Sequence, residues 1–200
     1  TDAPFTCATA GFSQSNRALL PELGRLLAKA VRTDTLIDLY AGAGLLPVLV
    51  AIFRDAPPRR VVCVEPDRRN TQYIEANIAA AAPTAKVRVI PRTAEGAVSG
   101  LSLDNGTTVL LDPPRGGLNK TVRRRLLAAG ERTGGASAPD IVYLSCDSAA
   151  LARDLAALRD TYAVESLTVI DFFPQTAHIE TLAVLRPRAG DAGEETGRPV

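Results

Sequence analysis

The first third of the chain contains the stretch Thr35-Leu36-Ile37-Asp38-Leu39-Tyr40-Ala41-Gly42-Ala43-Gly44. Residues 35–40 are rich in apolar side chains and predict a short strand, and the apolar run that begins at Leu45 predicts a helix. The two glycines allow a tight turn and a close approach of the backbone to a ligand at the helix start. The turn is either purely structural, since a short G-x-G is common by chance, or part of a binding site.

The spacing beyond the glycines favours a nucleoside ligand. A dinucleotide-binding loop would have a third glycine three residues after Gly44, where this chain has Pro47. The pattern therefore suits a nucleoside cofactor without a pyrophosphate, of which S-adenosylmethionine is the obvious example. The next predicted strand, at residues 60–65, ends in Glu65, and an acidic residue about 20 positions past such a loop accepts hydrogen bonds from ribose hydroxyls. We therefore expect Gly42, Gly44 and Glu65 to contact the cofactor.

A cysteine marks the end of another predicted strand, in Ile141-Val142-Tyr143-Leu144-Ser145-Cys146-Asp147. Ser148 opens a helical segment, so Cys146 should lie where a strand gives way to a helix. Ligands of open α/β sheets bind beyond the carboxyl ends of the strands, and a nearby helix start can lower the pKa of a thiol toward the reactive thiolate. The alternative is a small buried core residue, since free cysteine is among the most often buried residue types.

An aspartate ends the predicted strand at residues 107–111, in Asp112-Pro113-Pro114-Arg115-Gly116-Gly117. The two prolines fix the backbone, so we expect the Asp112 carboxylate to project into the cleft that holds the glycine loop and Cys146. Amino-group methyltransferases have a similar Asp-Pro-Pro run followed by an aromatic residue, but here Arg115 takes that position.

The remaining segments predict a doubly wound α/β fold. Further strands are expected at 86–90, 162–170 and 181–185, and helical segments alternate with the strands until the last two, which form a hairpin. We expect a mostly parallel, Rossmann-like sheet with this antiparallel hairpin at its C-terminal end, in one catalytic domain over residues 1–186. Residues 187–200 lack periodicity, which predicts a disordered tail.

Composition limits the possible function classes. The chain has 200 residues with 23 basic and 22 acidic side chains, so no global field draws it to nucleic acid or membrane, and RNA binding would need a local patch. Arginine clusters at 59–60, 68–69 and 123–125 suit phosphate contacts, but solvated helix faces are the favoured interpretation. The longest apolar runs are too short to span a bilayer, and no signal peptide is visible.

The cysteines point to a reducing compartment. Cys7, Cys63 and Cys146 lie far apart without a CxxC pair, which argues against a disulfide scaffold or a metal site. We expect a cytoplasmic, metal-free monomer in which Cys63 is a core residue. The chain begins at Thr1 and contains no Met, which predicts a fragment of a longer protein.

A thiol beside a methyl donor suggests a particular methyl acceptor. Carbon 5 of a pyrimidine is too weakly nucleophilic to take a methyl group until a thiolate adds at carbon 6. A base must later remove the carbon 5 proton, and Glu180 is the leading candidate, with a solvated turn residue as the alternative. For His178 an ordinary polar side chain without a role is favoured.

Five motifs, in order along residues 11–185, resemble those of the RNA uracil-5 methyltransferases. They are Gly11-Phe12-Ser13-Gln14-Ser15-Asn16, Asp38-Leu39-Tyr40-Ala41-Gly42-Ala43-Gly44, Asp112-Pro113-Pro114-Arg115, Tyr143-Leu144-Ser145-Cys146-Asp147 with Leu151-Ala152-Arg153-Asp154-Leu155, and Phe173-Pro174-Gln175-Thr176-Ala177-His178-Ile179-Glu180. The resemblance implies the class I S-adenosylmethionine-dependent methyltransferase fold, S-adenosylmethionine as cofactor, and a transfer or ribosomal RNA substrate whose target base is flipped out.

The resemblance also implies roles for single residues. In that family the cysteine matching Cys146 is the nucleophile and the glutamate matching Glu180 is the base. Four matched residues contact the cofactor, namely Gln14, Tyr40, Glu65 and Asp112. The aspartate also lies close to the target uracil, and Phe12 matches a residue near that base.

Two departures and two alternatives accompany the resemblance. Ala41 replaces a cysteine often found after the tyrosine, and the RNA-binding β-barrel or iron-sulfur part that usually lies upstream is absent from this chain. An RNA cytosine-5 methyltransferase also uses a strand-end cysteine, but it lacks the segment that ends in Glu180. A non-catalytic RNA-binding or RNA-folding module is the other alternative, against which an intact Cys146 and Glu180 argue.

Overall fold

The computed structural model describes residues 5–7, 16–131, 138–172, 174–176 and 179–188. Its strands are β1 (Thr35–Asp38), β2 (Arg60–Val64), β3 (Lys86–Ile90), β4 (Thr107–Leu111), β5 (Asp140–Ser145), β6 (Tyr162–Ile170) and β7 (Glu180–Pro187). Its helices are η1 (Arg17–Leu19), α1 (Leu20–Ala30), α2 (Leu45–Phe53), α3 (Arg68–Ala81), α4 (Ala94–Ala97), η2 (Val98–Gly100), α5 (Lys120–Glu131) and α6 (Ser148–Leu158).

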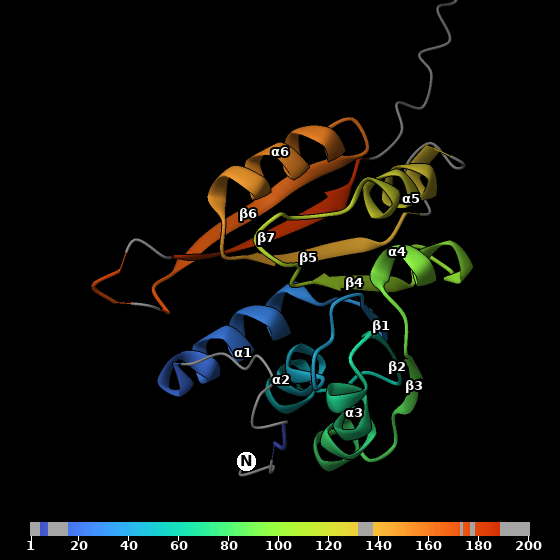
Figure 1. Cartoon of the computed structure of the whole chain (residues 1–200), viewed down its shortest axis with the longest axis vertical. Helices are drawn as coiled ribbons and strands as arrows, with labels where there is room; N and C mark the ends of the chain where they lie inside the picture. The colour runs from blue at the N-terminus through green and yellow to red at the C-terminus, as the bar shows by residue number, and fades with distance from the viewer. Residues whose placement is uncertain (1–4, 8–15, 132–137, 173, 177–178, 189–200) are drawn as a thin grey trace, which may run out of the picture.

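The strands form one sheet in the order β3-β2-β1-β4-β5-β7-β6 (Figure 1). The pairings among β1 to β5 are parallel, whereas β7 runs antiparallel to both β5 and β6. The order reverses between β1 and β4, and ligands of doubly wound sheets bind at such a reversal, beyond the carboxyl ends of the strands. The expected doubly wound sheet with a C-terminal hairpin is confirmed.

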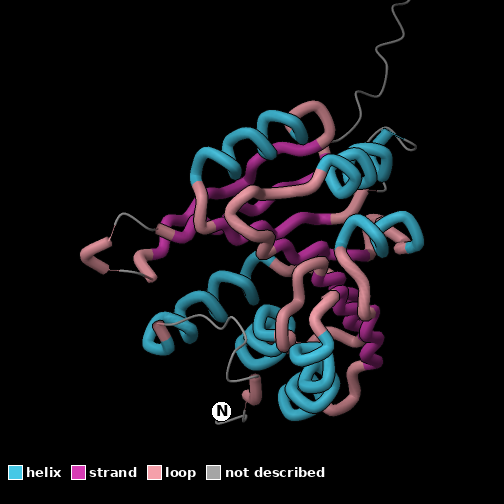
Figure 2. Tube along the Cα trace, viewed as in Figure 1, coloured by secondary structure: helices cyan, strands magenta, loops and turns pink. Residues whose placement is uncertain are grey.

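Helices cover both faces of the sheet (Figure 2). Alternate strand residues supply the two cores. Leu110 of β4 packs in the core shared with α1, α2 and α3, while its neighbours Val109 and Leu111 pack in the core shared with α4, α5 and α6. Each of these three side chains is fully buried. Burial on both faces explains why the central strands have continuous apolar runs rather than alternating ones.

The turn between β1 and α2 depends on its glycines. Gly42 has φ of 53° and Gly44 has φ of 87°, in the left-handed region that residues with a Cβ rarely adopt. The backbone angle is the constraint at Gly44, since a Cβ there would make only an ordinary contact, 3.5 Å from Cγ2 of Ile74 on α3. The backbone can therefore turn sharply from the strand into the helix and leave space beside the strand ends.

The structure adds details that the sequence patterns missed. Residues 93–103 gave no clear prediction and contain α4 and η2. Strand β7 is longer than expected and extends to Pro187, which pairs with Tyr162, so the predicted tail cannot begin before residue 188. The rest of that tail, from residue 189, lies outside the described residues.

None of the described helices has the length and hydropathy needed to cross a membrane.

The interpretation of residues 123–125 as a solvated helix face is wrong for two of the three arginines. Arg123 forms an ion pair with the buried Asp154, and Arg125 donates to the carbonyl oxygen of Leu101 at 2.8 Å. Arg124 is exposed. Cys63 is fully buried, as expected of a core residue.

Candidate active site

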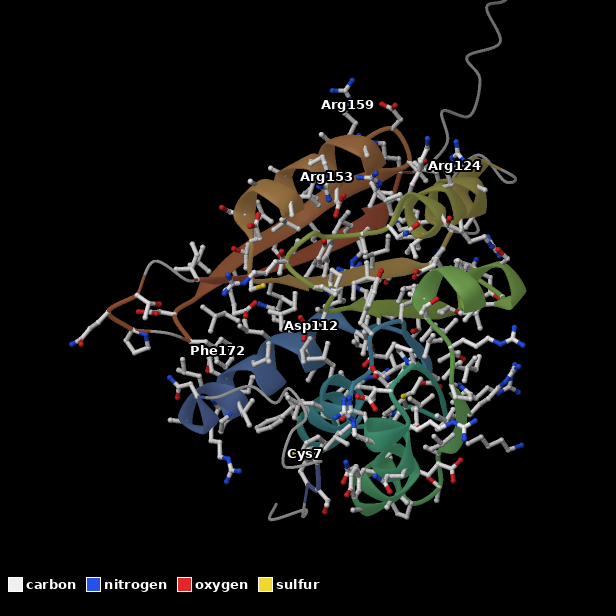
Figure 3. The ribbon with its side chains drawn as sticks, viewed as in Figure 1. Cys7, Asp112, Arg124, Arg153, Arg159 and Phe172 are labelled. Carbon is white, nitrogen blue, oxygen red and sulfur yellow. The ribbon has the colours of Figure 1, made fainter. Side chains whose placement is uncertain are left out.

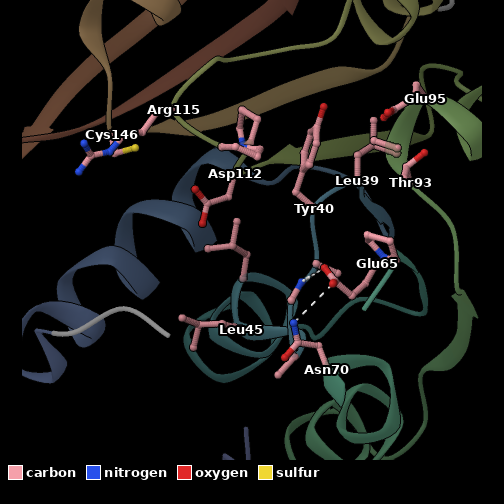
Figure 4. Close-up of a pocket in the computed structure, with 18 of the residues that line it drawn as sticks. Leu39, Tyr40, Leu45, Glu65, Asn70, Thr93, Glu95, Asp112, Arg115 and Cys146 are labelled. Atoms are coloured by element: carbon pink, nitrogen blue, oxygen red, sulfur yellow. Dashed lines mark hydrogen bonds between the residues drawn. The ribbon is translucent and has the colours of Figure 1, made fainter. Parts of the chain in front are cut away.

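A cavity of about 740 Å³ opens where β1, β2, β4 and β5 end and β7 begins. Its lining includes six of the residues that the sequence singled out, namely Tyr40, Gly42, Glu65, Asp112, Cys146 and Glu180. In Figure 4, Cys146 and Arg115 lie on one side of the cavity, Glu65 and Asn70 on the other, and Tyr40 between them. Figure 3 places Asp112 near the middle of the molecule. Gly44 shapes the turn but does not line the cavity. Phe12, Gln14 and His178 lie outside the described residues.

Antiparallel pairing explains how two distant residues reach the same wall. Ser145, the last residue of β5, pairs with Thr181 of β7. The residue that follows β5 is Cys146, and the residue of β7 that precedes Thr181 is Glu180. Because neighbouring strands keep their register, the cysteine and the glutamate emerge beside each other at the same edge of the sheet.

Glu65 is fixed by backbone donors at the other side of the cavity. One of its oxygens accepts the N–H of Gly42 at 2.9 Å, and the other accepts the N–H of Asp67 at 2.9 Å and the Asn70 amide at 3.4 Å. The residue as a whole is only 9% exposed. A carboxylate has about four lone-pair sites, so Glu65 keeps acceptor capacity for a ligand in the cavity.

The segment before α1 supplies a cavity residue that the sequence patterns did not single out. Phe5 lines the cavity. The neighbouring Thr6 is held by the buried Asn77 of α3, whose amide oxygen accepts the Thr6 N–H at 2.9 Å. The Asn77 amide nitrogen donates to the carbonyl oxygens of Thr6 at 2.7 Å and of Ala43 at 2.9 Å. One amide thus ties Phe5 to the glycine loop.

Three acidic side chains near the cavity have raised pKa values. Burial raises the pKa of Asp38 to about 7, and the nearby Glu65 adds to the rise, while the Tyr40 N–H opposes it. Burial raises the pKa of Asp112 to about 8, with contributions from Glu180 and Asp38. Burial also raises the pKa of Glu180 to about 7. These carboxyls therefore favour a cationic ligand, which would stabilise their ionised forms.

The prediction that a helix start lowers the pKa of Cys146 is wrong. Burial is the main cause of a raised pKa for this thiol, and the carboxyls of Glu180 and Asp112 add to it. Its own backbone N–H and the Arg115 guanidinium oppose the rise. The helix is present, but its cap is occupied, because Asp147 accepts the Ala150 N–H at 2.7 Å. Burial, reinforced by the two carboxyls, therefore sets the direction of the shift in the pKa of Cys146.

The raised pKa of Asp38 gives a test of the ligand-free domain. Between about pH 4 and pH 7 the folded chain holds a proton on Asp38 that the unfolded chain releases, so the free energy of unfolding should fall as pH rises. From about pH 5 to pH 8 we expect a loss on the order of 2 kcal/mol from this group. Urea unfolding across that range measures it.

Asp38→Asn is the matched variant for this test. It keeps an amide oxygen for the Tyr40 N–H, which Asp38 accepts at 3.2 Å. The variant should lose less stability than the wild type over the same pH range. Stability that stays constant or rises in the wild type, or an unchanged slope in the variant, would contradict the expectation.

The side chains that the sequence reasoning missed come from segments without a strong local signal. They are Phe5, Asn70, Thr93 and Glu95. Burial is the main cause that raises the pKa of Tyr40 to about 12. The negative charges of Glu95 and Asp154 add to this rise, and a hydrogen bond with the Asn119 backbone opposes it.

Among the described residues, no group of three His, Cys, Asp or Glu side chains is arranged to hold a metal ion.

Comparisons with known proteins agree on one family. A family model described as tRNA (Uracil-5-)-methyltransferase matches residues 8–188. An uncharacterized RNA methyltransferase of Streptomyces coelicolor is 32% identical over 196 residues, covering 94% of this chain and 40% of that protein. The 23S rRNA (uracil(1939)-C(5))-methyltransferase of Pseudomonas fluorescens is 39% identical over 99 residues, covering 48% of this chain and 20% of that protein.

A solved structure agrees with these relatives. The tRNA (uracil-54, C5)-methyltransferase of Pyrococcus abyssi, in complex with S-adenosyl-L-homocysteine, has a TM-score of 0.70 and 26% sequence identity. The match covers 88% of this chain and 40% of that one. The present chain therefore spans less than half of each of these relatives.

Proposed function

This chain belongs to the tRNA (uracil-5-)-methyltransferase family, and we propose that it methylates carbon 5 of a uridine in RNA with S-adenosylmethionine as the methyl donor. The observation that carries the proposal is the meeting of a thiol and a carboxyl in one cavity. The β5–β7 register brings Cys146 and Glu180 next to each other. Both residues line the same cavity as Glu65.

The residues around the cavity fit S-adenosylmethionine. Glu65 has acceptor capacity left for ribose hydroxyls, and the Gly42 backbone approaches the cavity without a side chain. Phe5 and Tyr40 offer aromatic faces for a planar base. When bound, S-adenosylmethionine supplies an electrophilic methyl group on a sulfonium, and the carboxyls of Asp112 and Glu180 suit that positive charge.

Cys146 would act first on the target uracil. Its thiolate adds to carbon 6, and the electrons of the carbon 5–carbon 6 double bond move toward the carbonyl oxygen at carbon 4. The resulting enolate makes carbon 5 nucleophilic; as the bond from carbon 5 to the methyl group forms, the carbon 4 carbonyl would re-form and the methyl–sulfur bond of the donor would break, which leaves S-adenosylhomocysteine. Arg115 aids this step, because it opposes the rise in the pKa of Cys146.

Glu180 would complete the reaction. It removes the proton from carbon 5, the electron pair re-forms the double bond, and the carbon 6–sulfur bond breaks to release the thiolate. Its oxygen Oε2 is buried and has no hydrogen-bond partner among the described residues, so an acceptor is available for that proton. A pKa of about 7 lies close to neutral pH, where a general base is most effective.

Glu65→Ala should weaken the binding of S-adenosylhomocysteine by roughly 10- to 100-fold, the loss expected when charge-assisted hydrogen bonds are removed. Isothermal titration calorimetry on the purified chain measures this affinity. Glu75→Ala is the matched control, since it removes an exposed glutamate from α3 outside the cavity. Equal affinities of the Glu65 variant and the wild type would exclude Glu65 from the cofactor site.

The test of the function is a map of 5-methyluridine in total RNA from cells with and without the gene. We expect one or more positions to lose the modification, and expression of the wild-type gene to restore it, whereas Cys146→Ala does not. The map also identifies the substrate, since the relatives include one enzyme named for ribosomal RNA and one named for tRNA. An unchanged 5-methyluridine map, or a change in 5-methylcytidine instead, would contradict the proposal.

A further inference from the structure

We propose that Asp154 is a positioning residue for the reaction, because it fixes the loop that follows Asp112 and carries Arg115 against the helix that follows Cys146. The inference rests on the function proposed above for the same cavity. Asp154 lies two turns into α6 and is fully buried. It does not line the cavity, so it would act through the loop rather than on the substrate.

Each oxygen of Asp154 has its own set of donors. Oδ2 accepts the backbone N–H of Leu118 at 2.7 Å and the Tyr143 hydroxyl at 3.0 Å. Oδ1 accepts from the guanidinium of Arg123 at 2.7 Å and from Nη2 of Arg153 at 3.0 Å. One oxygen thus holds the loop and β5, and the other holds two arginines.

The loop at residues 113–118 packs directly on this carboxylate. The N–H of Gly117 donates to the Pro114 carbonyl at 2.8 Å, which closes a tight turn, and Arg153 donates to the Gly116 carbonyl at 2.8 Å. Gly117 has φ of 72°, and a Cβ there would lie 2.5 Å from Oδ2 of Asp154. The close approach leaves no space for a side chain at position 117, so the loop packs tightly against α6.

The same helix fixes the thiol. Cys146 is followed by Asp147, which caps α6, so the turn that carries the thiol and the anchor of the loop belong to one rigid element. Beyond Leu118, the Asn119 backbone hydrogen-bonds Tyr40, which also lines the cavity. The β4–β5 pairing places Asp112 near the end of β5, and Asp154 fixes the part of the loop that carries Arg115 relative to the Cys146 side.

A purely structural role is the alternative, since breaking a buried ion pair by itself destabilises a fold. The positioning role depends on Oδ2 of Asp154, which holds the loop through the Leu118 N–H, whereas the ion pairs with the arginines depend on Oδ1. In Asp154→Asn the amide oxygen can still accept from the arginines. The amide nitrogen then faces the Leu118 N–H, and because both groups are donors the hydrogen bond to the loop is lost. Tyr143→Phe is the matched control, because it removes one hydrogen bond to the same oxygen and leaves the Leu118 contact in place.

The experiment measures the rate at which the purified chain forms a covalent complex with 5-fluorouridine RNA, at saturating RNA and S-adenosylmethionine. We expect Asp154→Asn to slow complex formation by roughly 10- to 100-fold, the effect of misplacing reacting groups. Its affinity for S-adenosylhomocysteine should stay within about threefold, since Glu65 and Gly42 lie outside the loop. Tyr143→Phe should react within about threefold of the wild type.

Two exposed arginines, one on α6 and one directly after it, give a second pair of variants in case Asp154→Asn does not fold. The Arg153 side chain is 51% exposed and anchors the loop. Arg159, which directly follows α6, is 75% exposed, pairs with Asp160, and extends outward beyond the helix (Figure 3). Arg153→Ala should slow complex formation by roughly 3- to 10-fold, since it removes one of the two anchors of the loop. Arg159→Ala should leave the rate unchanged and controls for lost positive charge.

The outcomes separate the two proposals. Wild-type rates in Asp154→Asn and Arg153→Ala, or equal slowing by each variant and its control, would overturn the positioning role and leave the proposed function intact. If the wild type itself forms no complex although it binds both RNA and cofactor, the proposed function fails and the positioning role fails with it.

Discussion

Cys146→Ala should reduce methyl transfer to RNA by about 10³-fold or more, because without a thiolate carbon 5 of uracil stays too weakly nucleophilic. Transfer of a labelled methyl group from S-adenosylmethionine to an RNA substrate measures the loss. Release of tritium from RNA labelled at carbon 5 of uridine should fall in parallel, since the proton leaves only after the adduct has formed. The affinity for S-adenosylhomocysteine should change little, because the Glu65 side of the cavity is untouched.

Cys7→Ala is the matched control for this prediction. Cys7 is also partly exposed and free, but it does not line the cavity. The control should therefore transfer methyl groups at the wild-type rate. If Cys146→Ala kept more than about a hundredth of the wild-type rate, the covalent route through this thiol would be wrong.

Glu180→Gln should separate the two halves of the reaction. The amide cannot take the carbon 5 proton, so turnover should fall by about 10²- to 10⁴-fold, while the thiolate can still add to carbon 6. The methylated adduct should then accumulate, because its release requires proton removal. A denaturing gel of protein and labelled RNA detects it as a slowly migrating band.

The pH dependence in the wild type bears on the same step. Glu180 must be ionised to act as a base, and its pKa is about 7, so release of the product should become faster as pH rises from about 6 to 8.

Glu165→Gln is the matched control for Glu180→Gln. It changes an exposed glutamate on the neighbouring strand β6 and should show neither the slowly migrating band nor the loss of turnover. Glu180→Gln with rapid turnover and no accumulated adduct would assign the base to another group.

Local patterns were enough to predict the residues that gather at one edge of the sheet. Glu65, Asp112 and Cys146 each follow a strand of a parallel sheet, and the ends of such strands meet wherever the fold is doubly wound. Glu180 joins them because it begins an antiparallel strand whose register with β5 is fixed by burial.

Other features depend on contacts that no local pattern reports. The pKa of Cys146 follows from carboxyls on β7 and after β4, which approach only in the folded chain. Phe5 reaches the cavity because Asn77, 71 residues along the chain from Thr6, holds its neighbour. The partner of Leu118 is likewise 36 residues away, in Asp154, whose motif gave no indication of which groups it would hold.

The most direct measurement is the site of attachment of RNA that contains 5-fluorouridine. After methylation, fluorine occupies the position of the proton that Glu180 would remove, so the adduct cannot resolve. We expect mass spectrometry of the digested complex to find methylated RNA attached to the peptide that contains Cys146, and to no other cysteine. Attachment to Cys7 or Cys63, or no complex when RNA and S-adenosylmethionine are both bound, would contradict the account.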